Sequence, residues 1–112
     1  MGVSYQAMLY VGKQFESAGD AEEFIRDKIG FTDEEEQELE EVGLQEMMYC
    51  KNRFNLGGEC INCYNGYGFL LGTELSVRQP ETFVRQVEEA FAKWNALFPD
   101  DPAEIIHTVK IY

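Results

Sequence analysis

The stretch that decides the fold is PETFVRQVEEAFAKWNALFP, residues 80–99. Its apolar side chains recur every three or four residues, which is the period of one face of an α-helix. Pro80 suits a first helical turn and Pro99 ends the pattern. The apolar stripe has to be buried against another element, so we expect a sheet beneath this helix. The stripe consists of Phe83, Val84, Val87, Ala90, Phe91, Trp94 and Leu97.

The strands of that sheet are predicted from alternation of side chains. VSYQAMLYV (3–11) and AEIIHTVKIY (103–112) alternate with a period of two, which is typical of half-buried strands. Residues 44–75 are also strand-like. Asn65-Gly66 is a strong signal for a two-residue hairpin turn, and NLGG (55–58) is a second turn signal. This region is therefore either one long hairpin with a glycine bulge or a three-stranded meander.

Two further helices are predicted before residue 44. The segment 21–29 has helical spacing, with Asp20 and Glu23 in a capping-box pattern and Gly30 at its end. The segment 32–43, here called the acidic arm, begins with a second capping-box pair, Thr32 and Glu35. Leu39 and Val42 are its only apolar side chains, so we expect a short and weakly anchored helix.

The predicted order is β-α-(α)-β-β-α-β. This order is typical of a ferredoxin-like α+β sandwich, in which an antiparallel sheet carries its two main helices on one face. With 112 residues, the chain is expected to form a single domain, 1–112, that includes the acidic arm. Many functions share this fold, so the fold alone predicts no activity.

The net charge of the chain limits the classes of partner that are expected. The net charge is −12, and without the seven acids of the arm the remainder still carries −5. Direct binding to nucleic acid or to an anionic membrane is not expected, because such binding relies on Lys and Arg. A basic protein is the expected partner, although the charge is also explained by solubility alone. No signal peptide or bilayer-spanning stretch is evident, so a cytoplasmic location is expected.

The candidate partner-binding residues fall into two sets. If both helices cover one face of the sheet, the open face presents an apolar and aromatic patch, which is typical of an interface or a homodimer. Its candidates are Met8, Tyr10 and Tyr112. The second set is the acidic arm, whose regularly spaced carboxylates resemble the charge of a nucleic-acid backbone. These are Asp33, Glu34, Glu35, Glu36, Glu38, Glu40 and Glu41.

The three cysteines allow an alternative function as a zinc-stabilised structural or regulatory domain. Cys60 and Cys63 form a CxxC pair, and Cys50 would lie across from Cys63 if the chain turned at Leu56 and Gly57. A closed zinc site needs four ligands, and a second CxxC pair is missing. Thiols packed in strands explain the same residues, so no cofactor is expected unless zinc binds.

An enzyme is not expected, because no nucleophile–base pair or phosphate-binding motif is present. His107 is the only histidine, and its alternation with apolar residues favours a structural place facing the helices. The remaining alternative is a small-ligand binder or enzyme with a cleft in a dimer, for which Tyr10, His107 and Tyr112 are the candidate polar groups. The main expectation is a small acidic protein-interaction module that inhibits or regulates a basic, nucleic-acid-handling protein.

Overall fold

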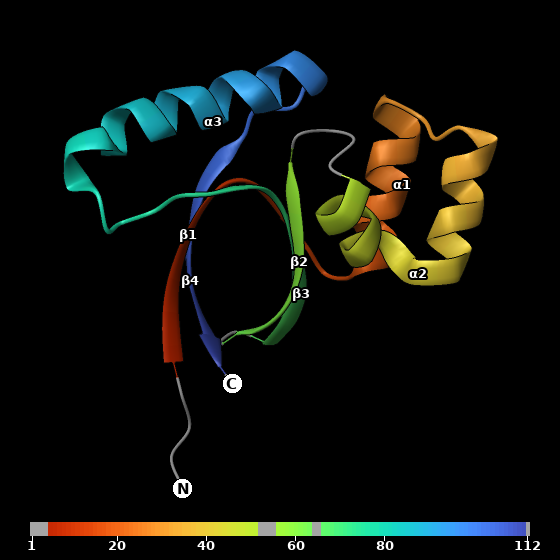
Figure 1. The fold of residues 1–112 in the computed structure, drawn as a ribbon, viewed down its shortest axis with the longest axis horizontal. Coiled ribbons are helices and arrows are strands. Elements are labelled where there is room, and N and C mark those ends of the chain that lie inside the picture. Colours follow the sequence, from red (N-terminus) through yellow and green to blue (C-terminus); the bar gives the residue numbers. More distant parts are fainter. Residues whose placement is uncertain (1–4, 52–55, 64–65, 112) are drawn as a thin grey trace, which may run out of the picture.

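The computed structural model describes the backbone of residues 5–51, 56–63 and 66–111. This part of the chain forms an antiparallel sheet of four strands and three α-helices, which confirms the α+β class. The elements, labelled in Figure 1, are β1 (Tyr5–Phe15), α1 (Ala18–Lys28), α2 (Asp33–Lys51), β2 (Gly57–Cys63), β3 (Gly66–Glu74), a 3-10 turn (Pro80–Thr82), α3 (Phe83–Leu97) and β4 (Glu104–Ile111).

The sheet has the strand order β2–β3–β1–β4 and curls until its two ends meet. β1 pairs with β3 and with β4, and β2 pairs with β3. One further pair, Cys63 with Lys110, joins β2 to β4 and closes the sheet. This closure was not expected from the sequence. It divides the sheet into an outer face, which the helices cover, and an inner face that is turned onto itself.

Helices α1 and α3 both pack on the outer face of the sheet. Trp94 of α3 and Ile25 of α1 join Phe69 and Leu71 of β3 in the largest buried cluster. Trp94 is fully buried, and its indole Nε1 donates to the carbonyl oxygen of Asp101 at 2.6 Å. The predicted apolar stripe of α3 therefore does pack on a sheet.

The inner face holds a second, smaller core. Met8 and Tyr10 of β1 pack with Ile61 and Leu70 from the strands opposite. Met8 is 4% exposed and Tyr10 is 5% exposed. The predicted open face is therefore wrong in the described part of the chain: curling of the sheet buries the side chains that a flat sheet would leave at the surface.

Residues 44–51 are helical, which contradicts the predicted strand. They form the second half of α2 after a break at Gly43, whose φ of 83° and ψ of 167° are not helical. Leu44, Met47 and Met48 are all buried. Their i, i+3, i+4 spacing is a helical signal that the strand prediction overlooked. β2 and β3 form a single hairpin, so neither a bulged hairpin over 44–75 nor a three-stranded meander describes this region.

Helix α1 begins earlier than predicted. Ser17 is its N-cap, and the Ser17 hydroxyl accepts a hydrogen bond from the Asp20 amide at 3.2 Å. Asp20 therefore lies inside the first turn and is not the cap. At the other end, Gly30 has a φ of 88°, and its amide donates to the Ile25 carbonyl, which is the predicted glycine stop.

Candidate functional site

The negative charge is concentrated on the lobe formed by α1 and the described side chains of α2. Residues 18–48 contain twelve acidic and two basic residues, a net charge of −10 out of −12 for the chain. Figure 1 shows this helical lobe beside β2 and β3, at one end of the longest axis. The rest of the chain is nearly neutral. A one-sided distribution of charge directs the field of the protein toward one surface.

Both cations of the lobe are already used in ion pairs. The Arg26 guanidinium donates to both carboxylate oxygens of Glu36, at 2.8 and 3.0 Å. Lys28 Nζ lies 3.0 Å from Asp101 Oδ2, which ties α1 to the turn after α3. Neither cation neutralises the exposed carboxylates. Sequence reasoning missed these two residues, although counting charges by segment would have located the lobe.

The acidic arm is more firmly held than expected. Glu35 Oε1 accepts from the Thr32 amide at 2.7 Å, and the Thr32 hydroxyl accepts from the Glu35 amide at 3.2 Å. The predicted capping box is therefore confirmed. Leu39 is 9% exposed and joins the main core. Together with the ion pair of Glu36, these contacts fix the arm against α1.

The seven predicted carboxylates consequently differ in role. The hydrogen bond from Arg26 lowers the pKa of the Glu36 carboxyl, and the same bond raises the pKa of Arg26. Glu35 and Glu36 are thus occupied within the lobe, and Glu38 is half-buried. The carboxylates that lie exposed are those of Asp33, Glu34, Glu40 and Glu41.

Tyr10 forms a buried polar contact at the rim of the inner core. Burial raises the pKa of its phenol, and the charge of Glu59, the charge of Glu74 and a hydrogen bond to Glu59 add to this shift. Tyr10 and Glu59 line a cavity of about 460 Å³ together with Gln45, Glu46 and two glycines. Tyr10 therefore lies inside the molecule, whereas Tyr112 lies outside the described residues.

The cysteines do not adopt the expected register. Cys50 is in helix α2 and so cannot lie across a hairpin from Cys63, which pairs with Gly66 and Lys110. Cys60 is exposed, and its amide donates to the side chain of Gln45 at 3.2 Å. The side chains of Cys50 and Cys63 lie outside the described residues. Among the side chains that are described, no three potential ligands converge on one point, and zinc binding stays a prediction.

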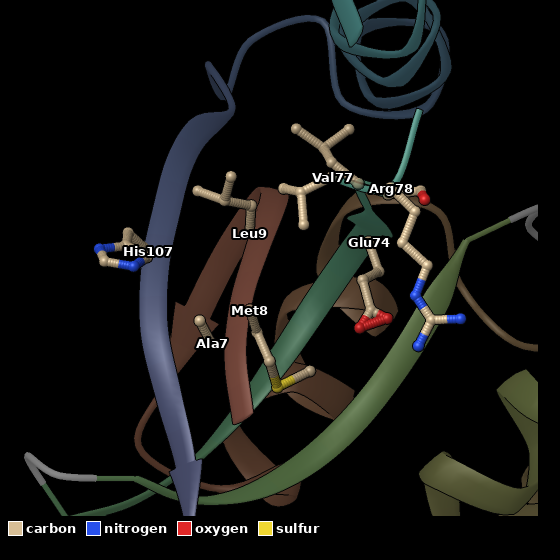
Figure 2. A pocket seen from close by; sticks show the side chains of 9 residues that line it. Ala7, Met8, Leu9, Glu74, Val77, Arg78 and His107 are labelled. Atoms are coloured by element: carbon tan, nitrogen blue, oxygen red, sulfur yellow. The ribbon is translucent and has the colours of Figure 1, made fainter. Parts of the chain in front are cut away.

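His107 is exposed and is not in the core. It lines a second cavity, of about 480 Å³, that lies between β1 and the segment following β3. Figure 2 shows Glu74 and Arg78 extending in the same direction, while His107 points away from both. Tyr10 lines the other cavity, so Tyr10 and His107 lie at separate cavities within one chain. The small-ligand alternative, a cleft in a dimer, stays a prediction.

Comparison with protein-family models, with curated proteins and with solved structures finds no match to this chain. Among the described residues, no helix is long and apolar enough to cross a membrane.

Proposed function

We propose that this protein is a small acidic interaction module that binds a basic protein through the lobe of α1 and α2. The observation that carries the proposal is the placement of a net charge of −10 on residues 18–48, where both cations are already paired with carboxylates. The partner class is a nucleic-acid-handling protein, which the module inhibits or regulates by occupying its basic surface.

The geometry of the acidic arm supports this partner class. Four of the seven carboxylates of the arm lie exposed along a stretch of helix about 13 Å long at 1.5 Å per residue, or one per about 3 Å. Duplex DNA presents one charge per about 1.7 Å of its axis, so the density of charge is of the same order. The capping box and the Arg26–Glu36 pair hold the arm in place, which reduces the entropy lost on binding.

The test compares two variants that remove the same number of charges. The lobe variant carries Asp33→Asn, Glu34→Gln, Glu40→Gln and Glu41→Gln, all at exposed positions. The control variant carries Glu81→Gln, Glu88→Gln, Glu89→Gln and Glu104→Gln, which are also exposed but lie outside the lobe. Wild type and both variants serve as baits for affinity capture from a host extract at low salt.

We expect a basic, nucleic-acid-handling protein to be retained by wild type and by the control variant, and lost with the lobe variant. The captured protein, once purified, should also release its nucleic acid when this module is added. Equal retention by all three baits would mean that the lobe is not the binding surface. Equal losses with both variants would mean that only net charge matters.

For the fold, we propose that the chain is a curled variant of the ferredoxin-like sandwich. The alternation of strands and helices along the chain and the packing of α1 and α3 on one face support this assignment. The chain differs from that sandwich in two features, which are the additional helix α2 and the residue pair that joins β2 to β4. An experimental structure in which α1 and α3 lay on opposite faces of the sheet would contradict it.

A further inference from the structure

We draw no further inference here: the strongest candidate, the edge of β4 around Ile105 and His107 that has no strand partner among the described residues, offers backbone groups to any extended chain, and nothing in the structure shows what covers it.

Discussion

Three glycines lie side by side across β1, β3 and β2 and permit the sheet to curl. Gly72 is opposite Gly12 on one side and opposite Gly57 on the other. A Cβ on Gly12 would overlap the Leu71 carbonyl oxygen and would stand 2.8 Å from the Gly72 Cα. Gly72 also has a φ of 149°, a conformation that side chains rarely permit. This row accounts for the close approach of β1 and β3.

The glycine row gives a graded prediction. Gly12→Ala and Gly72→Ala should each lower the free energy of unfolding by about 3 kcal/mol or more, because backbone atoms have to move. Gly57→Ala, whose Cβ would have ordinary contacts beginning at 3.4 Å, should cost about 1 kcal/mol or less. Urea unfolding measures all three. Equal effects at the three positions would mean that close packing of the row does not govern the curl.

Because the phenol of Tyr10 is buried, we expect the free energy of unfolding of wild type to fall at alkaline pH relative to that of Tyr10→Phe. Burial, followed by the charge of Glu59, raises its pKa above the ordinary value of 10.0. The folded state therefore holds this proton more tightly than the unfolded state. The resulting stability is present below pH 10 and is lost as pH rises toward the higher folded value. Tyr10→Phe should be less stable than wild type at pH 7, by about 1 kcal/mol for the lost hydrogen bond.

This difference between wild type and Tyr10→Phe should shrink above pH 10. Urea titrations at pH 7, 9 and 10.5 measure it, and the other alkaline-sensitive groups act equally on both proteins. A constant difference across this range would contradict the burial of an ionisable Tyr10.

At the scale of elements, α2 depends on its attachment to α1. The Glu36 carboxyl has a lowered pKa because it accepts hydrogen bonds from Arg26. Its contribution to stability is therefore present above the ordinary pKa of 4.5 and is lost as pH falls through the lower folded value. Glu36→Gln should be less stable than wild type at pH 7, and the two should converge near pH 3.

Glu34→Gln is the matched control for that experiment. Glu34 lies exposed in the same turn region, so its replacement should leave unfolding at pH 7 nearly unchanged. If Glu36→Gln behaved like Glu34→Gln at every pH, the ion pair would not anchor the arm.

The sequence predicts an element well where a single strong pattern of residues defines it. The stripe around Trp94, the alternation in residues 104–111 and the Thr32–Glu35 capping box all appear in the structure. The strand prediction for residues 44–51 is wrong because the predicted helix of the acidic arm, 32–43, ends at Gly43. Gly43 does interrupt the helix, but the chain resumes a helical path so that Met47 and Met48 reach the core.

At the scale of the whole molecule, two features could not be predicted from local patterns. Closure of the sheet depends on glycines that are far apart in the sequence and adjacent only across strands. The pairing of Arg26 and Lys28 depends on how α1 meets α2 and the turn at Asp101. The location of negative charge, by contrast, was present in the sequence, since residues 18–48 hold most of it.

The most direct measurement is the dissociation constant of the captured basic partner as a function of salt, for wild type, the lobe variant and the control variant. If the lobe is the binding surface, raising NaCl from 50 to 500 mM should weaken wild-type and control binding by about tenfold or more, because salt screens exposed charges. The lobe variant should bind weakly at both concentrations and change little. Wild-type affinity that is independent of salt, or a lobe variant with the same salt dependence as wild type, would contradict the account.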